Sequence, residues 1–371
     1  MMFVSHHDLT MTIIEKFFSL LRIAVGNGPG SRLEITEGEW YGIYDIACKQ
    51  SLVGIFIDAL DKLNQMGQKP PLNILLEWIG QSAQIRLQNQ RIDQQCEQLS
   101  SWFEKRGFSN SIVKGQGVAR LYSKPDLRQP GDIDIWVDGD RDDVVRLMRS
   151  QDIDVTVVDY VNCHAAFFGD TEVEVHFRPT WFYNPFVNKK VQKWIRDSKT
   201  EQMAHYDEQV GFGYPTVEFN LVFSLIHIYR HVLFEGIGLR QLTDYYFILR
   251  HSNNNERQRA LAILNSFGVK KFVGAVMYVM QRVYHMDSDT LICIADDTQG
   301  ELLLSEILLG GNFGKYDKRI KRVSSQQRWK NGFVNMKRNL RFMRYYPSEV
   351  LWMPIWKVWH YFWRMKHGYL D

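Results

Sequence analysis

Residues 111–137 read SIVKGQGVARLYSKPDLRQPGDIDIWV and end in a segment that alternates carboxylates with apolar residues. This period of two is typical of a strand with one buried face. It places Asp132 and Asp134 on one face and leaves a second, apolar face formed by Ile133, Ile135 and Val137. Two carboxylates on one side of a strand repel each other unless a cation lies between them. Their oxygen atoms are ligands that suit Mg²⁺ or Mn²⁺, so we expect a metal site here.

The residues around this strand strengthen the hypothesis of a nucleotide site. A short predicted strand ends before Lys114, and Gly115 then allows the backbone to approach a ligand closely. A helix predicted from Val118 would direct its N-terminus toward an anion. Further along, residues 171–177 (TEVEVHF) alternate again. That second strand presents polar side chains on one face: Glu172, Glu174 and His176. A neighbouring strand can therefore bring a third carboxylate next to the first two.

This order of strand, glycine turn, helix, Asp-x-Asp strand and later acidic strand resembles the DNA polymerase beta-like nucleotidyltransferase superfamily. The likeness is closer to a bacterial branch of nucleotidyltransferase family proteins and covers residues 108–178. The matching positions are Lys114-Gly115, Tyr122, Arg128, residues 131–137 (GDIDIWV) and Glu174-Val175-His176. The resemblance implies an α+β fold in which helical regions flank a polymerase beta-like core with a mixed sheet.

The resemblance also implies roles for individual residues. Asp132, Asp134 and Glu174 would bind Mg²⁺ or Mn²⁺ and serve catalysis, with Glu174 helping to deprotonate an acceptor hydroxyl. Four residues would bind the nucleoside triphosphate: Lys114, Gly115, Gln116 and Arg128. The superfamily usually has Gly-Ser or Gly-Gly where this chain has Gly115-Gln116. This departure leaves a changed substrate or a lost activity open as alternatives.

Hydrophobic periodicity divides the 371 residues into three expected regions. Residues 1–105 read as helices, residues 106–215 as the α/β core, and residues 216–371 as a second helical region. Within the core we expect parallel strand pairing early and antiparallel pairing late. The stretch 181–217 contains several glycines and prolines and is predicted to be an irregular connection.

A helix predicted over residues 219–233 carries His227 and His231 four residues apart, on one face. This spacing can bind a metal, but no glutamate adjoins His227 as it would in a zinc protease. A pair of histidines in a pocket or core is the simpler interpretation. Next along the chain, Arg240 and Asp244 either form a helix salt bridge or lie near the nucleotide or acceptor. The residues considered for the pocket are thus His176, His231, Arg240 and Asp244.

The bulk composition, with 45% hydrophobic and 23% charged residues, is ordinary for a globular protein. The net charge of +3 is unevenly distributed, because residues 314–371 hold 14 Lys/Arg against 3 Asp/Glu and the rest holds 31 against 39. The four cysteines have no Cys-x-x-Cys spacing, which argues against a zinc or disulfide framework. We find no leader pattern and no apolar run of about 18 residues. These features predict a cytoplasmic protein.

The basic tail contains an aromatic stripe at helical spacing formed by Trp352, Trp356, Trp359 and Trp363. Such a helix can lie in a membrane interface or dock by its tryptophans on the rest of the protein. Pro354 is expected to limit the helix at its start. We find no specific nucleic-acid motif.

Three functions remain open. The first is metal-dependent transfer of a nucleotidyl group from a nucleoside triphosphate to an acceptor hydroxyl, with release of pyrophosphate. The acceptor could be a small molecule, a sugar, a protein side chain or a nucleic-acid end. The second is a glycosyltransferase, since these enzymes also use Asp-x-Asp, although strands would then be expected within residues 1–105. The third is a non-catalytic descendant that acts as a binding protein or contacts a membrane surface through its tail.

Overall fold

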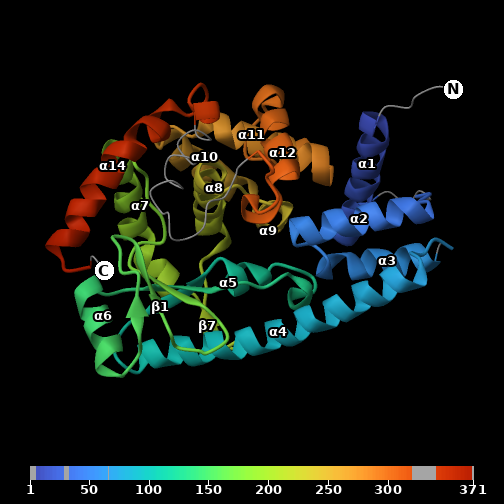
Figure 1. The fold of residues 1–371 in the computed structure, drawn as a ribbon. Coiled ribbons are helices and arrows are strands. Elements are labelled where there is room, and N and C mark those ends of the chain that lie inside the picture. The colour runs from blue at the N-terminus through green and yellow to red at the C-terminus, as the bar shows by residue number, and fades with distance from the viewer. Residues whose placement is uncertain (1–5, 29–32, 66, 320–339, 370–371) are drawn as a thin grey trace.

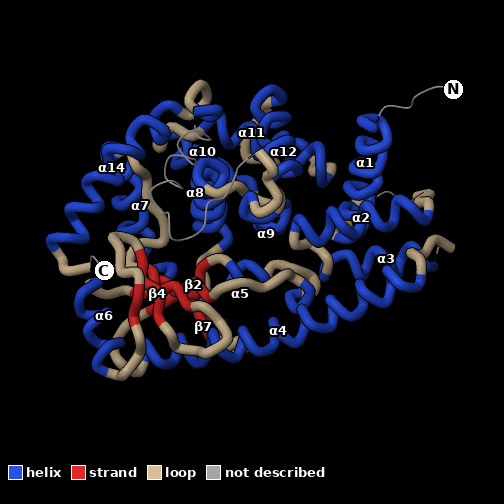
Figure 2. Tube along the Cα trace, in the orientation of Figure 1, coloured by secondary structure: helices blue, strands red, loops and turns tan. Residues whose placement is uncertain are grey.

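The computed structural model describes residues 6–28, 33–65, 67–319 and 340–369. Residues 320–339 of the predicted basic tail lie outside this description. Figure 1 shows a long helix along one side of the molecule, with the sheet near its C-terminal end and the later helices above it. Figure 2 shows that helices surround a small sheet.

Four helices precede the first strand: α1 (His6–Ala24), α2 (Glu37–Gln50), α3 (Ile57–Gln65) and α4 (Leu72–Glu104). The helix α2 begins at a capping box in which Thr36 and Glu39 satisfy each other's backbone groups. A 3-10 turn at Gly54–Phe56 separates α2 from α3. Every described helix or strand before residue 105 is a helix, which argues against the glycosyltransferase alternative.

The central sheet is mixed, as predicted. Its strands, in spatial order, are β1 (Asn110–Val113), β2 (Ile133–Val137), β5 (Val173–His176), β4 (Asn162–Ala165) and β3 (Val155–Thr156). Only β2 and β5 pair in parallel, and β1 pairs with β2 in an antiparallel manner. The expectation of parallel pairing early was therefore wrong. The connection between β1 and β2 contains only the five-residue helix α5 (Gly115–Ala119) and one 3-10 turn. Parallel neighbours need a crossover connection, usually a longer helix, so this connection favours the antiparallel pairing.

The two faces of the sheet contact different helices. Ile133, Ile135 and Val137 are at most 1% exposed and pack in one hydrophobic cluster with the C-terminal half of α4 and with α6 (Arg141–Ser150). On the other face, Trp136 stacks on Phe219 with ring centroids 5.8 Å apart. The face that carries Asp134 is thus turned toward the later helices, while the apolar face is buried as predicted.

The stretch 181–217, predicted to be irregular, contains the 20-residue helix α7 (Pro185–Ala204). This prediction was wrong because Asn184-Pro185 is a helix start and not only a turn. The Asn184 side chain accepts hydrogen bonds from the backbone N–H groups of Phe186 and Val187, and Pro185 occupies the first helical position. A short hairpin of β6 (Tyr206–Asp207) and β7 (Phe212–Gly213) follows.

The remaining helices are α8 (Val217–Phe234), α9 (Leu239–His251), α10 (Asn254–Ser266), α11 (Lys270–Tyr284), α12 (Asp297–Gly310) and α14 (Pro347–Lys366). Short 3-10 turns lie at Ser288–Thr290, Asn312–Gly314 and Leu340–Phe342. Pro354 lies inside α14, so the expectation that it limits the helix was wrong. One large hydrophobic cluster joins α1–α4 with α8–α12, so the core crosses the three regions expected from sequence.

The helix α14 docks on the protein through its tryptophans. Trp356 stacks on Trp181 with centroids 4.3 Å apart, and Trp359 and Trp363 contact the ring of Tyr160. The adjacent face of the helix presents exposed apolar residues at helical spacing: Leu351, Ile355, Val358, Phe362 and Met365. Within the described residues, no helix combines the length and apolar character needed to span a bilayer.

Candidate active site

The register of two neighbouring strands builds a group of metal-ligating side chains. Asp134 of β2 lies directly opposite Glu174 of β5, and His176 follows two residues later on the same face. One ligand atom from each of these three residues lies within 4.8 Å of the others. The Nε2 atom of His176 is 2.7 Å from Asp134 Oδ1 and 3.3 Å from Glu174 Oε2. The prediction that a later strand brings an acid beside Asp134 is confirmed.

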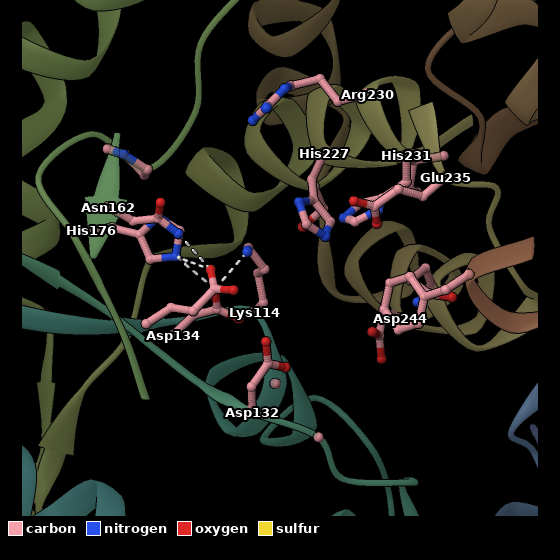
Figure 3. Close-up of a pocket in the computed structure, with 18 of the residues that line it drawn as sticks. Lys114, Asp132, Asp134, Asn162, His176, His227, Arg230, His231, Glu235 and Asp244 are labelled. Carbon is pink, nitrogen blue, oxygen red and sulfur yellow. Dashed lines mark hydrogen bonds and ion pairs between the residues drawn. The ribbon is translucent and has the colours of Figure 1, made fainter. Parts of the chain in front are cut away.

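Asp132 lies just before β2 and is exposed, whereas Asp134 is buried. Figure 3 shows both residues. The nearby charge of Asp134, together with burial, raises the pKa of Asp132 to about 6. Burial alone would raise the pKa of Asp134, but Lys114 and a hydrogen bond from His176 lower it. Asp134 is therefore firmly ionised, whereas the surroundings of Asp132 disfavour its anionic form.

Lys114 supplies the positive charge nearest to the acids. Its Nζ atom donates a hydrogen bond of 2.6 Å to Asp134 Oδ1. Burial opposes its charge, but Asp134, Glu174 and Asp132 raise the pKa of Lys114 above its usual value. Lys114 has a backbone φ of 57°, which side-chain-bearing residues rarely adopt, at the turn that leads from β1 into α5. This strained turn aims the ammonium group at Asp134.

The neighbouring strand β4 adds two residues that the sequence analysis missed. Asn162 donates a hydrogen bond of 2.7 Å to Glu174 Oε2. His164 lies opposite Glu174 in the antiparallel register, with its Nε2 atom 3.9 Å from Glu174 Oε1. The available signal was the alternation of these two polar residues with the buried Cys163 and Ala165. The hydrogen bond from Asn162 restrains the Glu174 carboxylate, whereas His164 makes its closer contact with Glu172, at 2.5 Å.

The acids open into a cavity of about 470 Å³, within the size range of small-molecule sites. Of the residues predicted from sequence, ten line it: Lys114, Gly115, Arg128, Asp132, Asp134, Glu174, His176, His231, Arg240 and Asp244. The opposite wall comes from α8 and α9, with Trp181, Tyr183 and Phe313 beside them. Figure 3 shows His227, Arg230 and His231 on this far side.

Gln116, predicted to bind the nucleotide, does not line the cavity. The residue is 3% exposed, and its side chain donates a hydrogen bond of 2.6 Å to Asp93 of α4. Arg120 also binds Asp93 through two contacts of 3.1 Å. The unusual Gly115-Gln116 dipeptide thus fixes the glycine turn to α4. Within the site, the backbone of this turn is exposed to a ligand at Gly115 rather than at Gln116.

Arg128 borders the cavity, but its guanidinium group is already occupied. It binds both carboxylate oxygens of Asp244, at 2.7 and 2.8 Å, and Tyr122 donates to the same carboxylate at 2.7 Å. In the described part of the chain Asp244 therefore pairs with Arg128, and no helix salt bridge to Arg240 is present. Arg240 instead donates to the carbonyl groups of Gln129 and Pro130, at 3.3 and 3.4 Å. These contacts hold the loop that leads to Asp132.

The donor set fits a divalent cation. Asp132, Asp134 and Glu174 all line the cavity, but the three residues whose ligand atoms lie within 4.8 Å of one another are Asp134, Glu174 and His176, and Asp132 is not among them. The charge of Asp134, together with burial, raises the pKa of Asp132 to about 6. Carboxylate oxygens suit Mg²⁺ or Mn²⁺, and His176 adds a nitrogen ligand to the group around Asp134. Lys114 and His176 both contact Asp134 Oδ1, so a cation would compete with them for that oxygen.

The fold is α+β, and its cavity carries a carboxylate pair on two adjacent strands. The chain belongs to the family of uncharacterised nucleotidyltransferases, whose pattern matches residues 36–285. A search of curated proteins gave no match. Among solved structures, an antigenic nucleotidyltransferase-like protein from Paracoccidioides brasiliensis is similar, with 12% identity and a TM-score of 0.35. That match covers 56% of this chain and 96% of the other.

Proposed function

We propose that the protein transfers a nucleotidyl group from a nucleoside triphosphate to an acceptor hydroxyl and releases pyrophosphate. The observation that carries this proposal is the pairing of Asp134 with Glu174 across parallel strands at the wall of the cavity. Membership of the nucleotidyltransferase family supports it. We further propose that the sheet and its helices form a polymerase beta-like core of the bacterial type.

In the proposed reaction, Asp132, Asp134 and Glu174 would hold Mg²⁺ or Mn²⁺. Bound there, the cation would neutralise phosphate charge and align the triphosphate for in-line attack. The acceptor oxygen forms a bond to the α-phosphorus, and the bond from that phosphorus to the bridging oxygen breaks. Glu174 takes the proton of the acceptor hydroxyl, while Asn162 holds its carboxylate in place. The pyrophosphate leaves with the electron pair of the broken bond.

Lys114 has a second role in this scheme. Before substrate binds, its ammonium group offsets the charge of Asp134 at 2.6 Å. Lys114 and Gly115 both line the cavity, so the ammonium group would also be placed to meet the charge of the triphosphate beside the Gly115 turn. Arg128 does not meet phosphate in this scheme. It fixes the wall of the cavity through its bidentate contact with Asp244.

The test is calorimetric titration of the wild-type protein with ATP, GTP, CTP and UTP, each with and without Mg²⁺. We expect at least one nucleotide to bind only when Mg²⁺ is present, which would also identify the donor. If the folded protein binds none of the four, the transferase proposal fails and the alternative of a non-catalytic binding protein takes its place.

A second proposal concerns peripheral membrane contact through α14. Five apolar side chains on its outer face are more than half exposed: Leu351, Ile355, Val358, Phe362 and Met365. Lys357, Arg364 and Lys366 lie on the same helix and would attract anionic lipid. The proposed contact uses this outer face, because the tryptophan face is occupied by the protein itself.

Vesicle flotation tests this contact without disturbing the fold. Wild type is expected to float with vesicles that contain phosphatidylserine and to remain below with pure phosphatidylcholine. The double variant Ile355→Ser/Phe362→Ser should lose binding. A control with the exposed Leu87→Ser substitution on α4 should bind like wild type. Equal flotation of all three proteins, or no flotation of wild type, would remove the membrane contact.

A further inference from the structure

Arg230 is a cation on the cavity wall that has no ion-pair partner within the part of the chain that the structure describes. Its guanidinium carbon lies 4.2 Å from the ring centroid of Trp181, and this stacking is its one specific contact among the described residues. Among the described residues no side chain forms a hydrogen bond or ion pair with it, although the charges of Glu349, Glu235 and Asp159 act on it from beyond bonding distance. Burial lowers the pKa of Arg230, but a guanidinium group remains charged in proteins. Arg230 is only partly exposed, and a charge partly withdrawn from water without a bonded partner is unfavourable, so the site favours an incoming anion.

The surroundings hold this guanidinium group in a fixed plane. Trp181 stacks on Trp356 of α14 with an interplanar angle of 21°, and the edge of Tyr183 packs on Trp181 at 4.6 Å. Glu349, at the start of α14, accepts hydrogen bonds from the backbone N–H groups of Tyr183 and Asn184 at 2.7 and 3.1 Å. The aromatic stack thus braces the Arg230 side chain from behind and leaves its N–H groups free for the cavity.

Other charged groups near Arg230 are engaged elsewhere. Asp159 lines the cavity but accepts hydrogen bonds from the backbone N–H groups of Val161 and Asn162. Glu235 contacts His231 Nδ1 at 3.1 Å. Burial and the charge of Lys114 lower the pKa of His227 well below its usual value, so its ring is neutral and can donate one N–H group without adding charge.

The cavity therefore has two ends of different character. Figure 3 shows Asp132 and Asp134 at one end and Arg230 on the far side, with His227 between Arg230 and Lys114. Carboxylates at the first end repel a bare oxyanion. A planar guanidinium group at the second end presents paired N–H donors, which match the oxygens of phosphate.

We propose that Arg230, braced by Trp181, is the binding residue for a phosphate group at the end of the cavity opposite the acids. The phosphate belongs either to the acceptor, which would then be a phosphorylated hydroxyl compound, or to the nucleoside triphosphate. This assignment of a substrate group rests on the proposed transferase function, but binding of phosphate at Arg230 does not depend on it.

The test uses inorganic phosphate as the probe and four proteins: wild type, Arg230→Gln, Arg230→Lys and Arg178→Gln. Arg178 is a matched control, because it stacks on Tyr160 at 4.0 Å as Arg230 stacks on Trp181 but does not line the cavity. We expect phosphate to bind wild type and Arg178→Gln with the same Kd. The Kd of Arg230→Gln should rise about tenfold or more, and that of Arg230→Lys should rise less. Thermal melting should show the same order of stabilisation by phosphate.

A structural role for Arg230 predicts other results. In that case Arg230→Gln would melt at a lower temperature than wild type, and phosphate would stabilise both proteins equally or neither. The proposal instead expects Arg230→Gln without phosphate to be at least as stable as wild type, because the substitution removes an unpaired charge. Equal phosphate affinity in wild type and Arg230→Gln, or no binding to wild type at millimolar phosphate, would overturn the proposal.

Two further titrations identify the source of the phosphate. If the Mg²⁺-nucleotide found for wild type binds Arg230→Gln with unchanged affinity, the phosphate belongs to the acceptor. If its affinity falls in parallel with that of inorganic phosphate, the phosphate belongs to the nucleotide. Asp134→Asn should still bind inorganic phosphate. Phosphate binding at Arg230 can therefore be judged even if the protein binds no nucleotide.

Discussion

At the scale of single residues, the cavity is lined by carboxylates that a ligand can reach and by an ion pair that stabilises the cavity wall. Asp134 and Glu174 face each other across parallel strands and are accessible to a ligand. Arg128 and Asp244 border the same cavity but form a bidentate ion pair with each other, and their side chains are only 5% and 12% exposed. Breaking a buried ion pair by removing one partner is far more damaging than breaking one on the surface.

This difference gives a stability prediction for Arg128. We expect Arg128→Met to lower the free energy of unfolding by about 3 to 5 kcal/mol, because it leaves Asp244 buried and without its bidentate partner. Urea denaturation measures this change. The control is Arg146→Met, whose exposed pair with Asp143 should cost no more than about 1 kcal/mol. Similar losses in the two variants would contradict the role given to Arg128.

At the scale of elements, α14 is anchored at its start by a buried carboxyl group. Burial raises the pKa of Glu349 to about 7, although backbone N–H groups of Tyr183 and Asn184 partly oppose this shift. The ordinary glutamate value is 4.5, so between pH 4.5 and about 7 the folded protein binds more protons than the unfolded chain. By linkage, this group makes the protein less stable as the pH rises through that window.

The corresponding prediction concerns the pH dependence of unfolding. Between pH 5 and 7, Glu349 should contribute a loss of up to about 1.4 kcal/mol per pH unit, and its contribution should level off above pH 7. Glu349→Gln should remove this component, whereas the exposed control Glu301→Gln should retain it. Unfolding free energies from urea titrations at several pH values measure the slope. An identical slope in wild type and Glu349→Gln would refute the assignment.

Some of the helices and strands could be predicted from the sequence, and others could not. Period-two alternation located β2 and β5, because their faces contact different layers. The helix α7 was missed because Asn184-Pro185 signals either a turn or a helix start, and only the following residues decide between them. The direction of β1 depends on how the 19 residues between the strands fold, and no local pattern encodes this.

At the scale of the whole molecule, the cavity is assembled from distant parts of the chain, which limited the prediction of the site. The alternating strands identified Asp134 and Glu174, but the partner of Asp244 is 116 residues away. The sequence could not reveal that Gln116 turns toward α4, since that contact depends on tertiary packing. Arg230 carried no motif, and its significance lies in the absence of a partner among the described residues.

The sequence pattern divides the chain into regions 1–105, 106–215 and 216–371, but these regions share one hydrophobic core. One hydrophobic cluster contains residues of all three regions, including Phe17, Trp136 and Leu242. The division itself stays a prediction. The cavity, lined from the sheet, α8 and α9, lies where the second and third regions meet.

The most direct test of the account is nucleotide titration in Mg²⁺ with a matched pair of aspartate variants. Asp134→Asn removes a carboxylate of the proposed metal site. Asp138→Asn changes the residue four positions later, which pairs with Lys199 and does not line the cavity. We predict that the Kd for the nucleotide is at least about a hundredfold higher in Asp134→Asn than in wild type. In Asp138→Asn this Kd should be unchanged. Equal nucleotide affinity in Asp134→Asn and wild type would contradict the central claim.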